Sequence, residues 1–291
     1  MPPTQRMRVK SDSLLVPDRV RRLIGQFRSL DLAATSLDAL EQALVEILEG
    51  YSTGTVQFRA QKIFRARKRT GPAPFSHFRE LWYVPSEKSH LVPMGRLNDS
   101  REVVFYCTDS DDIALVELRP VVGDRVCILE CEMRPDAWIQ ALPLGLHRHL
   151  ELDKPELASV VYEDKGNDEL YAKAENREAL KLLQDFLVEE LVRIVPDDAR
   201  HLYKTTVALA HLLLPAEIKK HGLAYPSIAV KLRGMNFMLS RAAADELFVP
   251  KRAWELHLFE QTAPLTFNAR RFRALKDIEP DGNLFWGNLP E

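Results

Sequence analysis

The chain has 291 residues, enough for one large domain or two ordinary ones, and its 46% hydrophobic and 28% charged residues are typical of a globular protein with a substantial core. Its 40 basic and 42 acidic residues nearly cancel, so the net charge of −2 gives no reason to expect DNA, RNA or an anionic membrane as a partner. Three cysteines are too few for a disulfide framework, and the sequence shows neither a signal peptide nor an apolar window of membrane-spanning length. We therefore expect a cytoplasmic protein with buried free thiols and no membrane partner.

The first 54 residues predict two amphipathic helices. The first begins at Pro17, and its apolar residues recur at helical spacing. They are Val20, Leu23, Ile24 and Phe27. The second helix begins at Ser36, a favourable N-cap residue, and stops at Gly50. Stripes of this kind are usually packing surfaces, so we expect a helical N-terminal extension over residues 1–54 that covers the next domain or forms a homodimer contact.

The remaining chain predicts an α+β fold with mixed or antiparallel sheets and helices that do not alternate regularly with the strands. The expected strands lie at 55–69, 103–108, 125–132, 223–232 and 235–239, with one or two more between 252 and 270. The expected helices lie at 110–118, at 176–195 and from 197 or 198 to about 214. We assign residues 55–270 to one domain with a partly helical insertion at about 135–200, and residues 271–291 to a C-terminal tail.

Common motifs for nucleotide binding, serine hydrolysis and zinc proteolysis are missing from the sequence. The densest histidine cluster, His147-Arg148-His149, has no cysteine or carboxylate nearby at zinc-ligand spacing. We therefore predict no bound metal.

A basic run from Lys62 to Arg69 leaves three interpretations open: a solvated edge strand, a nucleic-acid patch or a binding strand. Strand alternation would place Arg65 and Arg67 on the same face as Ile63, away from bulk solvent. The nearly neutral net charge argues against nucleic acid as a partner.

Five short blocks, in order and covering about 170 residues, together resemble the RES domain family. The blocks are Ile63-Phe64-Arg65-Ala66-Arg67; Gly95-Arg96-Leu97-Asn98; Val104-Phe105-Tyr106-Cys107-Thr108 followed by Ala114-Leu115-Val116-Glu117; Tyr203-Lys204-Thr205-Thr206 followed by Gly222-Leu223-Ala224-Tyr225-Pro226-Ser227; and Gly234-Met235-Asn236. Three features depart from the compact family pattern. Leu97 stands where an aromatic residue is common, and Glu117 and Ser227 are 110 positions apart in the sequence. The N-terminal helices have no counterpart in the shortest family members.

The resemblance implies a fold similar to that of ADP-ribosyltransferases and cleavage of NAD at the nicotinamide–ribose bond, by hydrolysis or phosphorolysis. Several family members are toxins that deplete NAD and are neutralised by a helix-turn-helix antitoxin, so the resemblance also implies NAD as substrate and such an antitoxin as partner. The arginine, glutamate and serine that name the family match Arg65, Glu117 and Ser227, which are thereby implied to be catalytic.

The chemistry of NAD cleavage suggests a role for each candidate residue. Arg65 and Arg96 could grip the pyrophosphate, because guanidinium groups bind phosphate oxygens with paired hydrogen bonds. Glu117 could stabilise the positive charge that develops on the ribose, Ser227 could orient a ribose or phosphate oxygen, and Tyr106 could stack on the nicotinamide ring.

Each of these residues also has an ordinary structural explanation. Glu117 could be a surface charge, Tyr106 a core residue, Ser227 a turn residue and Arg96 a brace for its loop. Two other functions therefore stay open: an ADP-ribosyltransferase, and a non-catalytic RES-fold interaction protein.

Overall fold

The computed structural model divides the chain into two compact units. It describes residues 15–51, 55–145, 174–214, 221–227 and 234–289. A helical unit combines residues 1–54, 94–99 and 164–213, and a sheet unit combines residues 55–93, 100–163 and 214–291. The N-terminal helices thus belong with the described helices of the predicted insertion. The His147–His149 cluster lies outside the described residues.

In the described part of the helical unit, α1 packs on α6 and α2 packs on α7. The helices described there are α1 (Pro17–Arg28), α2 (Leu37–Ile47), α6 (Ala174–Val192), the 3₁₀-helix η4 (Asp197–Tyr203) and α7 (Lys204–Leu213). The predicted apolar stripe of α1 is buried, and Phe27 packs edge-on against Phe186 with ring centroids 5.7 Å apart. Ser36 caps α2 as expected, because its side chain accepts a hydrogen bond from the Ala39 backbone N–H at 3.2 Å.

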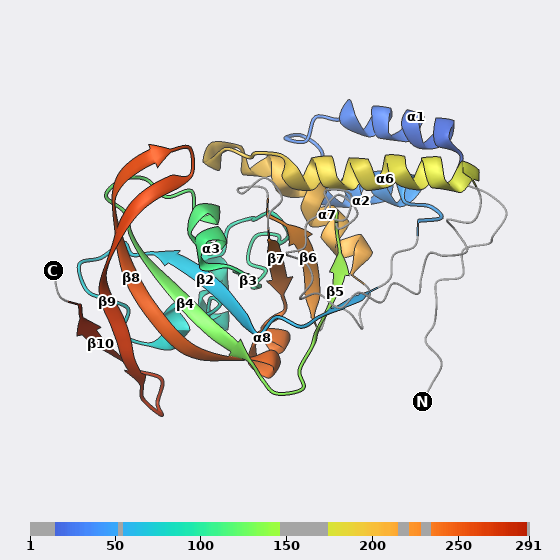
Figure 1. The fold of residues 1–291 in the computed structure, drawn as a ribbon. Helices are drawn as coiled ribbons and strands as arrows, with labels where there is room; N and C mark the ends of the chain where they lie inside the picture. The colour runs from blue at the N-terminus through green and yellow to red at the C-terminus, as the bar shows by residue number, and fades with distance from the viewer. Residues whose placement is uncertain (1–14, 52–54, 146–173, 215–220, 228–233, 290–291) are drawn as a thin grey trace. The chain divides into compact units, whose positions relative to one another are not determined.

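The described residues of the sheet unit form one sheet of ten strands in the order β1-β5-β6-β7-β3-β2-β4-β8-β9-β10. The strands are β1 (Val56–Phe58), β2 (Lys62–Lys68), β3 (Phe105–Thr108), β4 (Arg125–Met133), β5 (Ile139–Pro143), β6 (Gly222–Pro226), β7 (Met235–Leu239), β8 (Phe248–Ala263), β9 (Thr266–Ile278) and β10 (Leu284–Asn288). Among these strands every neighbouring pair is antiparallel except β5 and β6, which run parallel. Figure 1 shows β8 and β9 as a long twisted hairpin. The predicted α+β class is confirmed.

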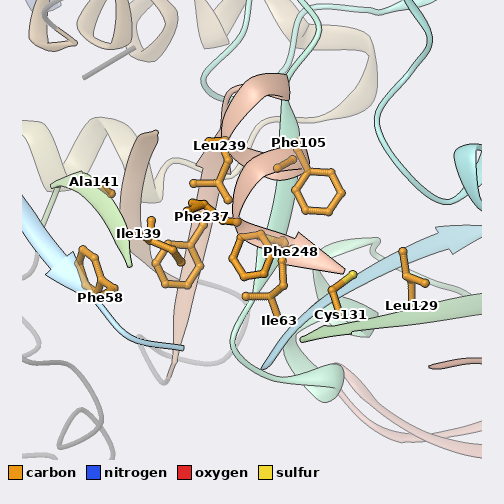
Figure 2. Close-up of a cluster of buried hydrophobic side chains, with 14 of the residues drawn as sticks. Phe58, Ile63, Phe105, Leu129, Cys131, Ile139, Ala141, Phe237, Leu239 and Phe248 are labelled. Atoms are coloured by element: carbon orange, nitrogen blue, oxygen red, sulfur yellow. The ribbon is translucent and has the colours of Figure 1, made fainter. Parts of the chain in front are cut away.

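Each face of the sheet packs against its own helix. On one face, Phe64 and Ala66 of β2 pack with Leu115 and Leu118 from α3 (Asp111–Glu117) and its C-cap. The opposite face carries the larger hydrophobic cluster, drawn in Figure 2, which includes Ile63. On that side the helix α8 (Arg241–Leu247) packs against this cluster. The segment around the 3₁₀-helix η1 (Phe78–Glu80) packs against the same cluster. A second short 3₁₀-helix, η2 (Ser86–Leu91), follows η1 in the chain.

All three cysteines are buried free thiols, as predicted, and all lie within the larger cluster. Burial raises the pKa of each thiol, so Cys107, Cys127 and Cys131 are protonated packing residues at neutral pH.

Several elements differ from the sequence predictions. Strand β5 and helix α8 were not expected, and β8 begins at Phe248 rather than at 252. The predicted C-terminal tail contains the end of β9 and all of β10, although we expected only loop beyond Asp277. Residues 228–232 of one predicted strand lie outside the described residues. In the described part of the chain, no helix combines the length and hydropathy of a membrane span.

Gly222 is required where β6 and β7 come close together. Its φ is +137°, and a Cβ atom there would overlap the backbone carbonyl oxygen of Met238. Gly222→Ala should therefore lower the free energy of unfolding by about 3 kcal/mol, because both the dihedral and the strand contact become strained. Gly71→Ala is the control, since a Cβ there meets no atom within 4 Å. Urea denaturation of both variants would measure the difference, and equal midpoints would contradict the prediction.

Candidate functional site

Helix α3 places Glu117 at its C-terminal end. Ile113, Ala114 and Val116 are buried, so the helix is anchored to the sheet while Glu117 stays exposed. The chain then reverses through Arg119, whose φ is +47°. The helix dipole disfavours a carboxylate at this end, so helix stability does not explain why a glutamate is here.

Strands β6 and β7 supply two polar residues next to α3. Ser227 directly follows β6, and its backbone N–H donates to the carbonyl oxygen of Gly234 at 3.1 Å. Asn236 lies in β7, directly across from Tyr225 of β6. Gly234 has a φ of +69°, and a Cβ atom there would collide with Ile113 of α3, so the approach of β7 to this helix requires a glycine.

The junction between β3 and β7 is held by Asp109. Its Oδ1 accepts from the Met235 backbone N–H at 3.0 Å, and its own N–H donates to the Met235 carbonyl oxygen at 3.1 Å. This reciprocal pair fixes the start of β7 relative to the end of β3, and therefore sets the position of Asn236.

Glu117, Ser227 and Asn236 meet in what we call the Glu117 cluster. The Glu117 Oε1 atom accepts from Ser227 Oγ at 2.7 Å and from Asn236 Nδ2 at 2.6 Å. Both donors are buried, with 0% of Ser227 and 3% of Asn236 exposed, whereas Glu117 is exposed. Hydrogen bonds to an ionised group are the strong class, so one carboxylate oxygen is held in place while the residue keeps an accessible surface.

Tyr106 lies on the same face of the sheet as the Glu117 cluster. In antiparallel strands, directly paired residues point to one face, and Tyr106 pairs with Met238 while Thr108 pairs with Asn236. Tyr106 is half-buried. It shares a face with Asn236 and is two strand positions away from it along the β3–β7 pair.

Arg65 points to the opposite face. Phe64 pairs with Thr108 and so shares the face of Asn236, which leaves the alternate residue Arg65 on the other side with Ile63. The Arg65 Cζ atom accordingly lies 5.2 Å from the centroid of the buried Phe105 ring. The expectation that Arg65 joins Glu117 and Ser227 in one site is therefore not met: the structure brings together only the last two.

The contacts of Arg65 describe a structural brace. Its Nη1 donates to the Tyr106 backbone carbonyl oxygen at 2.7 Å, linking β2 to β3, which share a single directly paired position. Burial and the adjacent Arg67 lower the pKa of Arg65 to about 9, which leaves it charged at neutral pH. Burial also lowers the pKa of Arg67, whose Nη1 donates to the Glu80 carbonyl oxygen. As predicted, both arginines share the face of Ile63.

Arg96 belongs to the helical unit. Its Nη1 donates to the carbonyl oxygens of Leu191 and, at 3.2 Å, Arg193, at the C-terminal end of α6. Its Cζ atom lies 5.4 Å from the centroid of the Tyr203 ring, and its carbonyl oxygen accepts from Thr206 Oγ1. These contacts correspond to the bracing role that the sequence left open, since a guanidinium stabilises the free carbonyls at a helix end.

Sequence reasoning did not assign a role to Asn236, although it is in one of the five matching blocks. The signal was a polar residue inside the apolar strand Met-Asn-Phe-Met-Leu. Its Oδ1 is buried without a hydrogen-bond partner among the described residues. Buried polar groups are normally paired, so an asparagine in such a strand points to a specific local task.

Within the described ranges, no group of three histidine, cysteine, aspartate or glutamate side chains is arranged to hold a metal ion. No model of a known protein family matches the chain, and no curated protein matches it in sequence. The RES resemblance therefore stays a prediction from the residues themselves.

The contact between Asn236 and Glu117 can be tested by adding a charge. In Asn236→Asp, two carboxylates would share the Glu117 cluster, which raises their folded-state pKa values above the unfolded ones. A raised carboxyl pKa makes stability fall as pH rises, so the variant should be about 2 kcal/mol less stable than Asn236→Ala at pH 7 and equal to it below about pH 4. Thermal denaturation across this pH range measures the difference. A gap that does not change with pH would show that the two side chains do not interact.

Proposed function

We propose that this protein is a RES-type enzyme that cleaves the nicotinamide–ribose bond of NAD, as a glycohydrolase or phosphorylase, with Glu117 as its central catalytic residue. One observation carries the proposal. Ser227 Oγ donates a hydrogen bond to Glu117 Oε1 at 2.7 Å, although the two residues are 110 positions apart in the sequence. The five sequence blocks that resemble the family contain both residues and Asn236.

The geometry suits a reaction that develops positive charge. When the bond from ribose C1 to nicotinamide breaks, its electron pair goes to the ring nitrogen and C1 becomes cationic. Water or phosphate then bonds to C1, and water loses a proton in doing so. An oriented carboxylate beside C1 stabilises this cation, or hydrogen-bonds the ribose hydroxyls, and such electrostatic contacts are typically worth about 2.7–4 kcal/mol.

In this proposal Ser227 and Asn236 are positioning residues. They hold the Oε1 atom of Glu117 by hydrogen bonds of 2.7 and 2.6 Å, so that the remainder of the carboxylate faces substrate without rotating. Tyr106, on the same face, is the candidate for stacking on the nicotinamide ring. We assign Arg65 to bracing β3 and not to NAD. A phosphate-binding role for Arg96 would require it to serve a ligand in addition to α6.

The biological role that fits this activity is the toxin of a toxin–antitoxin pair, because unregulated NAD cleavage depletes a cofactor that the whole cell needs. A helix-turn-helix antitoxin is the partner that the family resemblance implies. ADP-ribosyl transfer is a close variant, in which another nucleophile replaces water or phosphate at C1.

A non-catalytic RES-fold interaction protein is the second candidate. Its supporting observation is that Arg65, one of the three family-naming residues, lies on the opposite face from Glu117 and is engaged with the Tyr106 carbonyl oxygen. This candidate predicts that purified protein neither consumes NAD nor transfers ribosyl groups.

Glu117→Gln tests the catalytic role. It keeps the size of the side chain but removes the charge, and it should slow NAD cleavage by about 100- to 1,000-fold. The rate is measured as release of nicotinamide with and without phosphate, and the sugar product distinguishes hydrolysis from phosphorolysis. Glu246→Gln is the matched control, an exposed glutamate near the end of the equally short helix α8, and it should react at the wild-type rate. Absence of NAD loss in wild type, or a fully active Glu117→Gln, would refute the proposal.

The variant Arg65→Met distinguishes a structural role of Arg65 from a role in binding the phosphates of NAD. Loss of a charge-assisted hydrogen bond to NAD would cost about 1.5–3 kcal/mol, which raises KM by about 10- to 100-fold. Because Arg65 lies on the other face of the sheet, we expect KM for NAD to stay at the wild-type value and any change to appear in thermal stability. A tenfold rise in KM with unchanged stability would return Arg65 to the substrate site.

A further inference from the structure

Three basic side chains line up across strands β4, β8 and β9. Arg125 of β4 pairs directly with His257 of β8, and His257 pairs directly with Arg270 of β9. Directly paired residues of antiparallel strands point to the same face of the sheet. The three side chains therefore form a row that crosses the strands, which we call the basic row. Figure 1 shows the three strands next to one another in the sheet.

The basic row lies on the face of the sheet opposite to the Glu117 cluster. In β4, Val126 belongs to the hydrophobic cluster that packs with α3, and Cys127 belongs to the larger cluster on the other face. Arg125 alternates with Val126 and so shares the face of Cys127. The Cζ atoms of Arg125 and Arg69 accordingly lie 5.7 Å and 5.9 Å from the centroid of the same ring, that of Phe272. The row is therefore separate from the site of the proposed reaction.

All three residues of the basic row are exposed, and the carboxylates closest to them in the strands have other partners. Glu255 is 1% exposed and accepts from Arg273 Nη1 at 2.7 Å. Glu260 accepts from Asn268 Nδ2 at 2.7 Å. Among the described residues, no carboxylate forms an ion pair with a member of the row. Basic side chains directly opposite one another are unfavourable in a strand pair, so this arrangement points to a negatively charged ligand.

The spacing and surroundings of the basic row suit a nucleic-acid strand. Neighbouring strands of a sheet lie about 4.8 Å apart, so the row extends about 10 Å from Arg125 to Arg270. A single nucleic-acid strand carries one phosphate per about 3.4 Å of its axis, so the row spans about three phosphates. Bases can stack on aromatic rings and on guanidinium groups. Arg125 is held against the Phe272 ring, and Phe259, two residues beyond His257 in β8, is 53% exposed.

We propose that the basic row binds single-stranded nucleic acid without sequence preference. The strand crosses β4, β8 and β9, with phosphates on Arg125 and Arg270, a hydrogen bond from His257, and a base stacked on Phe259. A duplex binds more weakly, because its bases are already stacked on one another. The net charge of −2 for the whole chain does not oppose this binding, because exposed charges farther away than about 10 Å are largely screened.

Fluorescence anisotropy on the full chain, with a labelled oligothymidylate of about 15 nucleotides, tests the ligand class. We expect a Kd of about 10–100 µM at about 50 mM salt. Two neutralised phosphates predict a slope of about −1.4 for the logarithm of the association constant against that of the salt concentration. A polyglutamate peptide and a DNA duplex of the same length should bind at least threefold more weakly. No binding of the oligothymidylate, or equal binding of either competitor, would overturn the proposal.

Variants of β4 and β9 locate the binding. Arg125→Gln and Arg270→Gln should each weaken oligothymidylate binding by about fivefold at low salt, and the double variant should bring the salt slope close to zero. Arg271→Gln is the matched control. It removes the same charge from the adjacent position of β9, but the Arg271 Cζ atom lies 4.4 Å from the centroid of Trp254, which belongs to the cluster on the α3 face.

The control should bind the oligothymidylate with the wild-type Kd. Equal losses in Arg270→Gln and Arg271→Gln would show that only the net charge matters, and would refute the basic row as the site. Glu117→Gln should also keep the wild-type Kd, so the result does not depend on whether NAD is cleaved. Binding lost in Glu117→Gln but kept in Arg125→Gln and Arg270→Gln would assign the oligothymidylate to the Glu117 cluster instead.

Discussion

Successive side chains of a β-strand point to opposite faces, and in β2 this rule decides which residues can act together. Phe64 shares its face with Thr108 and Asn236, the face covered by α3, and Arg65 necessarily takes the other one. A shift of one residue in the register of β2 would exchange the two sets, placing the guanidinium beside Glu117 and an aromatic ring in the opposite core. The composition of the candidate site therefore follows from strand register more than from proximity in sequence.

Arg65 in β2 also shows that a buried charged residue can serve to hold two strands together. Arg65 bridges β2 and β3 through a carbonyl oxygen at a place where the two strands have only one paired position. A guanidinium retains its charge in such a setting better than a lysine would, and its flat face packs over the Phe105 ring. A residue type that suits phosphate binding is thus equally suited to joining two strands, and the contacts distinguish the two uses.

The sequence predicts correctly those elements whose apolar pattern or capping residue lies within the element itself. The stripe of α1, the cap at Ser36 and the apolar runs of β3, β4 and β7 were all predicted. Length does not explain the elements that the sequence did not predict, because α3 and β3 are as short as α8, β5 and β10. The apolar runs of β5 and β10 are interrupted by Pro143 and Gly287, which weaken a strand pattern. These elements depend on partners distant in sequence.

The sequence predicts only part of the candidate site. Glu117 and Ser227 were paired by resemblance to a family, and the structure brings them into hydrogen-bond contact. The separation of Arg65 from them was not predictable, because alternation along β2 gives two faces but does not say which one α3 covers. Asn236 has a usable sequence signal, a polar residue within the apolar run Met-Asn-Phe-Met-Leu, but only the structure shows that it is buried and contacts Glu117.

The single parallel pair among the described strands, β5 with β6, has a consequence for how the chain folds. Parallel neighbours need a crossover, and here residues 144–221, with α6 and α7 among them, separate the two strands. Long-range pairing of this kind is slow, because the entropy of closing the loop is lost before the strand contacts form. During synthesis Glu117 emerges from the ribosome more than a hundred residues before Ser227 and Asn236. A nascent chain therefore cannot assemble the Glu117 cluster until the crossover is complete, and its folding order delays the site until the protein is nearly finished.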